Sequence, residues 1–417
     1  MIRNFKKKFF EIDNKDRFFF IVFSFFPLSL IIGNLVINSS IFLLSLIFLL
    51  NLKENKFYIK NSLIYLLLFF FVSLLINLIF STNPTNSLPR VIKIFFIILL
   101  IIQTLRIFNK YKQHTLGNIF LIWSLIFVIV LIDCLFESIF GFNSFGFSSS
   151  MTGRVASFFG DELVVGAFVH GFALIFLSYL MIRNINNYLI IFSIFAIIII
   201  SFLIGERSNF IKTFTALIIF SSFAINLKLS HKILSFFILM CLIFGILNFN
   251  QDYKYRYYSQ IEQMIVAGDI SKLYKNSQYG AHQNAAIKIL YEFPTFGVGV
   301  KNFRHESNKT KYESADYKST NVKQATHPHQ AHLEILSETG IFGYLCFIIF
   351  IFGSLGLSLK NYIMNKNLFQ LSAIIFIFTS LLPVLPSGSF LSTFTSGIFW
   401  INFSIMIGFC KVLKSKS

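Results

Sequence analysis

The chain has 417 residues, a net charge of +18 and a composition that is 55% hydrophobic and only 13% charged. Its apolar runs are too long for the core of a soluble domain, so the composition excludes an ordinary soluble protein and indicates a multi-spanning membrane protein. In such a protein the excess of lysine and arginine first indicates how the chain is oriented in the membrane. We expect no nucleic-acid partner. The four cysteines lie in apolar runs without metal-ligand or redox spacing, so we expect no disulfides.

The basic segment before Phe18 precedes apolar sequence without a cleavage site, so we interpret it as a retained cytoplasmic end. Residues 18–52 are too long for one span, and the polar stretch Asn34–Ser40 predicts a turn between two spans. Each later apolar run is close to the roughly 17 to 25 residues that a membrane-crossing helix needs. The sequence therefore predicts an all-α integral membrane protein with about twelve transmembrane helices. The later runs cover residues 63–80, 91–105, 119–136, 163–181, 188–204, 210–225, 233–249, 341–357, 368–385 and 390–410.

The distribution of charge supports this count, because lysine and arginine concentrate in short cytoplasmic loops. With twelve spans and both termini in the cytoplasm, twenty basic residues fall in cytoplasmic segments, and only Arg90, Arg154 and Arg207 fall in short external loops. One fused span would invert every later loop and remove this separation. We therefore expect a single membrane domain over residues 1–417, with a large external loop at residues 250–332. This loop is periplasmic if the cell has two membranes.

Within the loop, the segment HQNAAIKILYEF predicts a short amphipathic helix that lies against the membrane or the spans. Pro294 then ends the helix, and Gly297 and Gly299 of PTFGVGV suit a tight turn. Two glycines alone are a weak signal for phosphate binding. The apolar face of the helix is made by His282, Ala286, Ile289, Leu290 and Phe293.

Charged residues are scarce at the centres of the predicted spans and crowd their outer ends. This pattern favours a reaction or binding event at the external surface over an ion path through the membrane. In LIGERSNF, Arg207 lies in a short turn between two spans, where its guanidinium can bind a pair of phosphate oxygens. The alternative, which residue type alone favours, is an interfacial arginine that pairs with the neighbouring Glu206.

The stretch THPHQAHLEILSETGIFGY places three of the eight histidines within six residues, directly before an apolar run. Pro328 suits the first position of a helix with His327 as its cap, so His329 would lie in the first turn and share a face with His332. Backbone N–H groups there attract anions. A neutral imidazole, with an ordinary pKa of about 6.5, can take a proton from a sugar hydroxyl. Two alternatives are polar surface histidines and a metal site, although the two-histidine-plus-glutamate metal signature is missing.

Together these segments resemble the O-antigen ligase and O-antigen polymerase family of bacterial membrane glycosyltransferases. Residues 326–344 resemble the family's His-Pro-His-Asn segment with a following Glu-x-Gly-x-x-Gly, in which Glu338 is the glutamate. The segment ILYEFPTFGVGVKNFR is similar to the family's Pro-x-x-Gly-x-Gly segment with its trailing Asn-Phe. The turn Gly205–Ser208 resembles its interfacial arginine turn, and RVASFFGDELVVGAF resembles an external segment of these proteins.

The resemblance implies transfer of a glycan from an undecaprenyl-diphosphate-linked donor, at the periplasmic face of the bacterial inner membrane. In the ligases of lipopolysaccharide biosynthesis the acceptor is the lipid A core, and in the polymerases it is another lipid-linked repeat unit. The family pattern makes His329 the base that activates the acceptor hydroxyl and Arg207 a diphosphate-binding residue. We expect ligase activity without cofactor or metal, with the polymerase as the alternative and a glycolipid transporter as a further one.

The chain departs from the family pattern at three positions. Gln330 occupies the usual asparagine position, and His332 stands where an aromatic residue is common. His282 lies where many relatives carry a second arginine. Arg304 and Arg256 are the two candidates for that charge, and we place Arg304 in the diphosphate site. The accessory candidates are His282, His332, Glu338 and Arg154.

Overall fold

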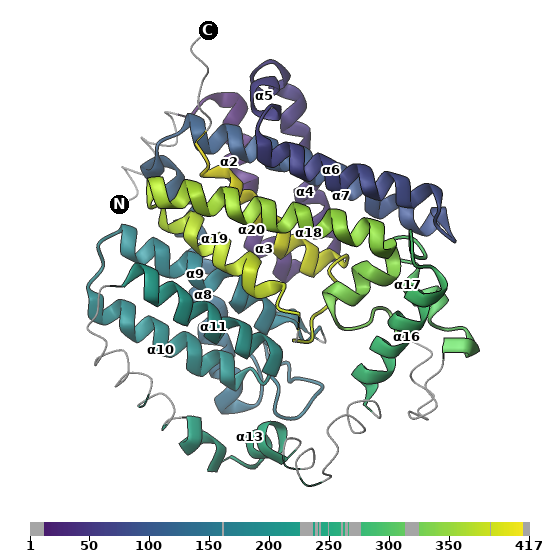
Figure 1. Cartoon of the computed structure of the whole chain (residues 1–417). Coiled ribbons are helices and arrows are strands. Elements are labelled where there is room, and N and C mark those ends of the chain that lie inside the picture. The colour runs from purple at the N-terminus through teal and green to yellow at the C-terminus, as the bar shows by residue number, and fades with distance from the viewer. Residues whose placement is uncertain are drawn as a thin grey trace.

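The computed structural model describes residues 12–160, 162–225, 243–248, 250–259, 277–312, 325–383 and 385–411, with the single positions 237, 241, 262 and 266. Within these ranges all regular secondary structure is helical (Figure 1). The expected all-α class is therefore confirmed for this part of the chain. The span predicted at residues 233–249 lies mostly outside the described residues and stays a prediction.

The first helices are α2 (Asn14–Ser24), α3 (Phe26–Ile32), α4 (Asn34–Leu50) and α5 (Leu52–Ile59). The turn predicted at Asn34–Ser40 is wrong, because these residues form the first two turns of α4. The chain breaks one residue earlier, at Gly33, whose φ of 128° suits a residue without a side chain. α5 then bends by 100° from α4.

The later apolar runs that the structure describes form helices at the predicted places. Among the described residues, five helices are long and apolar enough to cross a membrane, or six if α4 and α5 count as one span. The chain is thus a multi-pass helical membrane protein. The helices are α6 (Ser62–Ile79), α7 (Pro84–Lys110), α8 (Gln113–Phe140), α9 (Val165–Ile182), α10 (Asn187–Leu203), α11 (Arg207–Ala224), α18 (Ala331–Asn365), α19 (Leu368–Ser380) and α20 (Thr393–Gly408).

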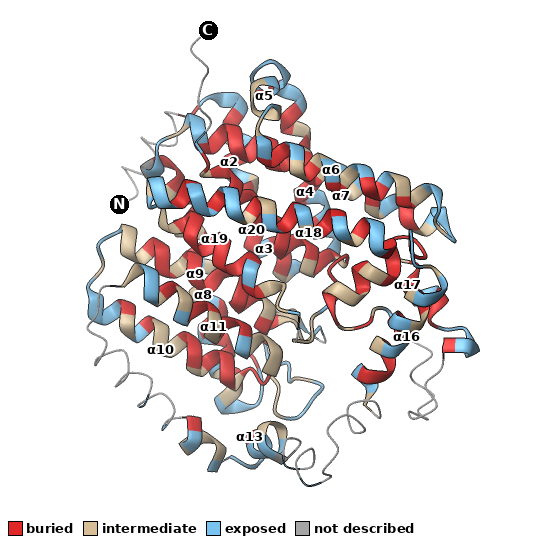
Figure 2. Ribbon diagram, viewed as in Figure 1, coloured by how far each residue is buried: buried red, intermediate tan, exposed pale blue. Residues whose placement is uncertain are grey.

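Aromatic and branched side chains fill the core of the bundle. α7 packs against α4, α6 and α20, while α18 packs against α6. In the core the rings of Phe120 and Phe369 stack with centroids 3.8 Å apart. Figure 2 shows buried residues along the inner faces of the helices and exposed residues along the outer faces. The outer faces carry large apolar side chains such as Leu35 and Phe352, which a membrane protein presents to lipid.

The bundle has two ends, separated by α7, whose 27 residues span roughly 40 Å at a helical rise of about 1.5 Å per residue. At the first, the terminal end, the described ends of the chain meet: Lys110 Nζ lies 2.8 Å from Asp16 Oδ2, and Asn109 Nδ2 donates to Cys410 O at 3.0 Å. At the other, the loop end, the turn between α6 and α7 meets the long loop, where Thr82 N donates to Val298 O at 3.0 Å.

The long loop contains the predicted amphipathic helix. Ala286 and Ile289 of this helix are buried and pack with Val298 in a small second core. The helix also packs against α18, so its apolar face is covered by protein. It ends at Glu292, shortly before Pro294, as predicted. The described helices of the loop are α13 (Gln251–Lys254), α16 (Gln278–Glu292) and α17 (Phe303–Glu306).

Candidate active site

A break in α18 separates an outer part, residues 331–339, from an inner part, residues 341–365. At the break, Gly340 has a φ of 66° and a ψ of −174°, which are not helical values. The segment that begins at Pro294 lies along the break, because Ile341 N donates to Pro294 O and Gly299 N donates to Glu338 O, each at 2.8 Å. The two motifs that the sequence presents 40 residues apart therefore bond to each other, and the backbone groups freed by the break are satisfied.

The glycines of both motifs are required by this close approach. A Cβ atom on Gly340 would lie 2.3 Å from Thr295 O, and one on Gly297 would lie 2.5 Å from the carbonyl carbon of Glu338. Both glycines also have positive φ, where side chains are strained. Gly297 therefore lies against the backbone of Glu338 and Gly340, whereas Gly299 lies against the side chains of Ser81 and Asn302.

Glu338, an expected accessory residue, is buried and bonded to backbone. Its carboxylate accepts from Lys301 N at 2.7 Å and from Phe303 N at 3.4 Å. Its backbone carbonyl accepts from Asn77 Nδ2 at 3.0 Å. The residue thus holds the segment before α17 against α18.

The helix start predicted at Pro328 is wrong, because α18 begins at Ala331 and its cap is Gln330. The Gln330 side chain accepts from Leu333 N at 2.6 Å and donates to Pro383 O at 2.7 Å. His329 precedes the cap with a φ of 55°, in the left-handed region. The amide at the usual asparagine position therefore caps the helix and ties it to the loop between α19 and α20.

Three aromatic rings surround His329. The ring centroid of His329 lies 4.1 Å from that of His327, 5.0 Å from Tyr279 and 5.3 Å from His282. Among the described residues, neither ring nitrogen of His282 nor Nε2 of His327 has a hydrogen-bond partner. Buried polar atoms without partners indicate a place for a polar ligand or water. The structure therefore brings together His329 and the accessory candidate His282.

Burial keeps this histidine group neutral at pH 7. Burial, and then the neighbouring His282, lower the pKa of His329 to about 4. Burial, followed by the charge of His329, lowers the pKa of His327 to about 3, and burial also lowers the pKa of His282. A neutral imidazole has one nitrogen with a free lone pair, which is the form that a general base requires.

His332 points away from this group. Its Nε2 lies 2.8 Å from Leu381 O and its Nδ1 lies 3.1 Å from the hydroxyl of Tyr344. Because a carbonyl only accepts, Nε2 donates and ties α18 to the end of α19. The prediction that His329 and His332 share a helical face is wrong, since His329 lies outside the helix. In the described part of the chain, no group of three or more His, Cys, Asp or Glu residues is arranged to hold a metal ion.

The loop between α19 and α20, residues 381–392, connects the histidine group to Arg207. Ser387 N donates to His329 O at 2.9 Å. Pro386 O accepts from Ser208 Oγ and, at 3.2 Å, from Lys212 Nζ. His329 and the residue after Arg207 are therefore held by adjacent residues of one loop, whose Cα atoms are about 3.8 Å apart.

Arg207 begins α11 and belongs to a set of three guanidinium groups, which we call the arginine group (Arg154, Arg207 and Arg256). Burial, and then the charges of Arg154 and Arg207, lower the pKa of Arg256, whose Nε donates to Gly205 O at 2.5 Å. Glu206 pairs with Arg154, with 3.3 Å between Oε1 and Nη2. The alternative in which Glu206 pairs with Arg207 is wrong, and no described residue forms an ion pair with Arg207.

Arg304 lies in a second set of basic residues, which we call the lysine–arginine group (Arg90, Lys93, Lys301 and Arg304). Arg304 is exposed, and its charge acts on Arg90 and Lys301. The charges of Arg90 and Lys301 act in turn on Lys93. The sequence offers Arg304 and Arg256 for the second charge beside Arg207. The structure places Arg256, and not Arg304, beside Arg207.

The sequence interpretation overlooked Lys93, Lys212 and the 381–392 loop. A signal was present, because each lysine interrupts an apolar run, and a charge in a membrane helix is usually kept for function. The loop was also marked, since Pro386 and Gly388 lie between two predicted spans.

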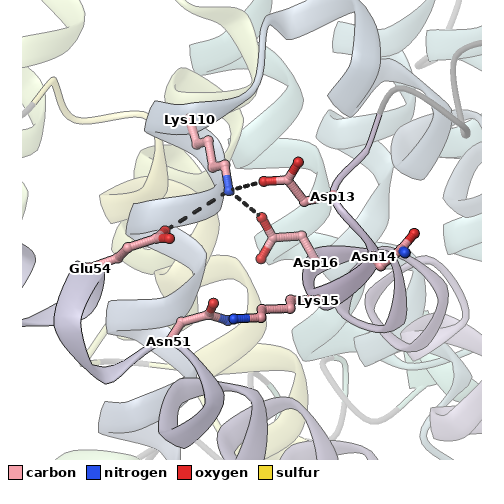
Figure 3. Close-up of a pocket in the computed structure, with 7 residues that line it drawn as sticks. All are labelled: Asp13, Asn14, Lys15, Asp16, Asn51, Glu54 and Lys110. Atoms are coloured by element: carbon pink, nitrogen blue, oxygen red, sulfur yellow. Dashed lines mark hydrogen bonds and ion pairs between the residues drawn. The ribbon is translucent and has the colours of Figure 1, made fainter.

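A pocket at the terminal end contains none of these residues (Figure 3). One of its two lysines, Lys110, bonds to Asp13 at 2.6 Å and to Asp16 at 2.8 Å, and lies 3.9 Å from Glu54. Its acidic groups thus already have basic partners. The lining residues are Asp13, Asn14, Lys15, Asp16, Asn51, Glu54 and Lys110.

The apolar helices and the polar groups at one end of them define a multi-pass membrane protein with a candidate active site at its loop end. Residues 191–348 match the family model of the O-antigen ligases, a segment that contains Arg207, His282, Arg304, His329 and Glu338. The matched segment, which covers less than half of the chain, is therefore similar to the O-antigen ligases. Proteins of that family are membrane glycosyltransferases, so the similarity supports an enzyme. No curated protein matches the chain at a significant level.

Proposed function

We propose that this protein is an O-antigen ligase-type glycosyltransferase, which moves a glycan from undecaprenyl diphosphate to a lipid A core acceptor at the periplasmic face of the inner membrane. One observation carries the proposal. Adjacent residues of the 381–392 loop bond to His329 and to Ser208, the neighbour of Arg207. A neutral imidazole and an unpaired guanidinium therefore lie beside one loop, and holding two substrates there would supply the orientation that such a transfer needs.

In this reaction the acceptor oxygen attacks the anomeric carbon of the donor sugar. The bond from that carbon to the diphosphate oxygen breaks, and the diphosphate leaves with the bonding electrons. His329 takes the proton of the acceptor hydroxyl. Arg207 and Arg256 stabilise the negative charge that develops on the leaving group. No metal or other cofactor is needed for these steps, so a chelator should leave the rate unchanged.

The start of α11 adds to the attraction for the diphosphate. Glu206 is the N-cap of this 18-residue helix, yet its side chain makes no cap bond to the helix amides. Its carboxylate bonds instead to Arg154 and to Gly166 N. The first-turn amides of α11 therefore stay available for an anion, which the helix dipole also favours.

The low pKa of His329 suits a proton transfer late in the reaction. At pH 7 the ring is neutral, and the neighbouring histidines are neutral as well. An anion that develops nearby raises the pKa of an imidazole. The departing diphosphate would therefore make His329 more basic as the donor bond breaks.

A two-substrate assay with the purified protein tests the proposal. Transfer of glycan to the lipid A core supports the ligase. Lengthening of the lipid-linked donor in the absence of core identifies the polymerase, which the same residues would serve. If neither product forms and the lipid-linked glycan only crosses a vesicle membrane, the protein is a transporter and both transfer assignments fail.

The proposal includes a topology of twelve spans in one membrane domain, with both termini in the cytoplasm and residues 250–332 in the periplasm. It is supported by the separation of basic residues along the sequence and by the meeting of the described chain ends at the terminal end. In a variant without its four cysteines, Asn308→Cys should react with an impermeant thiol reagent added to whole spheroplasts, and Lys56→Cys should not. The reverse pattern would invert the topology.

A further inference from the structure

The lysine–arginine group has an excess of positive charge. Its four basic side chains are accompanied by two carboxylates, Glu334 and Glu338, whose charges act on Lys301. Both carboxylates already accept other hydrogen bonds. Glu334 accepts from Ser389 Oγ and, at 2.7 Å, from Phe390 N, and Glu338 accepts from the backbone amides of Lys301 and Phe303. In the described part of the chain, no ion pair involves the four basic residues. An excess of like charge in a partly buried place is unfavourable unless an anion joins it.

Within this group, Lys93 gives the most direct indication that an anionic ligand binds. Its Nζ is buried and has no hydrogen-bond partner among the described residues. An ammonium group has three donors, and leaving all of them unbonded away from water is costly. Arg90 and Lys301 have only neutral partners, Thr393 at 3.2 Å and Ser389 at 3.1 Å. The group includes the exposed Arg304 and the buried Nζ atom of the half-buried Lys93, so a ligand can reach it from the surface.

The group lies on the histidine side of the 381–392 loop. The charge of Lys301 acts on His327, whose ring lies 4.1 Å from that of His329. Lys301 Nζ also bonds to Ser389, two residues after the serine that bonds to His329. The arginine group, by contrast, is connected to the loop through Ser208 and Pro386. The loop that bonds to the candidate base therefore also bonds to Lys301 and to the neighbour of Arg207.

We propose that the lysine–arginine group binds an anionic substituent, a phosphate or a carboxylate, on the acceptor glycan and so positions the acceptor hydroxyl at His329. The arginine group then serves the diphosphate of the donor alone, and Arg304 acts on the acceptor. The assignment to the acceptor rests on the proposed function, whereas the binding of an anion by this group does not.

A binding experiment tests the anion site without any transfer. The purified full-length protein is titrated with glucose 6-phosphate, glucuronate, glucose and inorganic pyrophosphate, with saturation-transfer NMR as the measurement. We expect the wild type to bind glucose 6-phosphate or glucuronate at least about tenfold more tightly than glucose, because charge-assisted hydrogen bonds form only with the anions. The tighter of the two anions tells whether phosphate or carboxylate is preferred.

Variants then locate the site. The double variant Lys93→Met, Arg304→Gln should lose the preference for the anionic sugar and keep its affinity for pyrophosphate, and Arg304→Gln alone should lose part of it. Arg207→Gln should keep the preference for the anionic sugar and lose affinity for pyrophosphate. Lys56→Gln, at an exposed residue of the terminal end, should bind every ligand as the wild type does. Unchanged helical content and a single size-exclusion peak show that each variant is folded. Equal affinity of the wild type for glucose and the anionic sugars overturns the proposal, and so does loss of the preference in Arg207→Gln.

A kinetic experiment tests the assignment to the acceptor. The double variant should raise the KM for an anionic acceptor at least about tenfold and leave the KM for the donor within about twofold. For the wild type, an acceptor without the anionic substituent should have a KM that is higher by a similar factor. For the double variant, acceptors with and without the substituent should have the same KM. A rise in donor KM instead would overturn the acceptor assignment. Absence of transfer by the wild type would contradict the proposed function and leave the binding result standing.

Discussion

The two ends of the bundle differ in how several of their basic residues are held, although Arg154 at the loop end pairs with Glu206. At the terminal end, buried Arg106 bonds to Asp16 and, at 2.5 Å, to Glu54. Figure 3 shows that Lys110 bonds to Asp13 and Asp16. At the loop end, the described residues form no ion pair with Arg207, Lys93 or Arg304. Buried cations with carboxylate partners indicate a structural role, because the charge is already neutralised. Unpaired cations beside neutral histidines instead indicate a site for an anionic ligand.

The largest expected effect is that of His329→Ala on the transfer rate. Removing a general base costs about 10² to 10⁴ in rate, and we expect a loss within this range. The measurement is single-turnover transfer by the purified variant, with helical content as the folding check. His305→Ala, an exposed histidine of α17 at the same end, is the matched control and should keep the wild-type rate. Full activity of the His329 variant would remove the base assignment.

At the terminal end, Asp16→Asn should change stability and leave catalysis alone. Asp16 is fully buried against Arg106, and breaking a buried pair costs about 3 to 5 kcal/mol. We expect about 3 kcal/mol in the free energy of unfolding, since Glu54 still bonds to Arg106. The measurement is unfolding in mixed micelles, with transfer per folded molecule as the second readout. Asp13→Asn, at a carboxylate that is 63% exposed, should lose less than about 1 kcal/mol. A fall in transfer per folded molecule with Asp16→Asn would show that the terminal end also affects catalysis, which contradicts this prediction.

For Arg207, replacement by lysine should be almost as harmful as replacement by alanine. We expect each to lower kcat/KM for the donor by about a hundredfold, because a point charge cannot reproduce a two-pronged phosphate contact. Arg183→Lys, at an exposed arginine of the terminal end, is the matched control and should have no effect. Donor binding at the wild-type level by Arg207→Lys would show that the site needs only charge.

A smaller effect is expected for Lys212→Gln, which tests the 381–392 loop as the connection between the two groups. Lys212 is buried, and its Nζ bonds to the same carbonyl as Ser208. Glutamine can still donate to Pro386 O but reaches less far, so we expect about a tenfold loss in kcat with donor and acceptor KM little changed. Lys212→Met removes the donor and should lose more. Equal wild-type rates in both variants would show that the loop is positioned without Lys212.

The same contrast explains what the sequence predicted. The positions of the long apolar helices from α6 onward follow from apolar runs, and α16 follows from its periodicity, because both signals are local. Arg207 and His329 were found from their residue types and the neighbouring motifs, and the structure places both at one end. These predictions needed no knowledge of which distant segments touch.

The errors arose where a distant contact decides the local structure. The start of α18 depends on the Gln330 amide, which bonds to Pro383, 53 positions away. Glu206 turns to Arg154, 52 positions before it, rather than to its neighbour Arg207. The 381–392 loop carries no charged side chain, so its importance lies entirely in the backbone groups that it offers to Ser208 and His329.

The smallest expected effect, a flat pH profile, tests how closely the rings enclose His329. Neutral imidazole is the reactive form, and burial, followed by His282, lowers the pKa of His329 to about 4. The base should thus stay neutral as the pH falls from 8 to 6, with kcat/KM changing less than about twofold, and be lost only as the pH approaches 4. A solvent-exposed histidine would instead lose the base around its ordinary pKa of about 6.5. His282→Ala reduces both the burial and the charge effect, so the midpoint should move upward. A wild-type midpoint near 6.5 would show that the histidine group is open to water, and the loop end would then differ from the terminal end only in its unpaired cations.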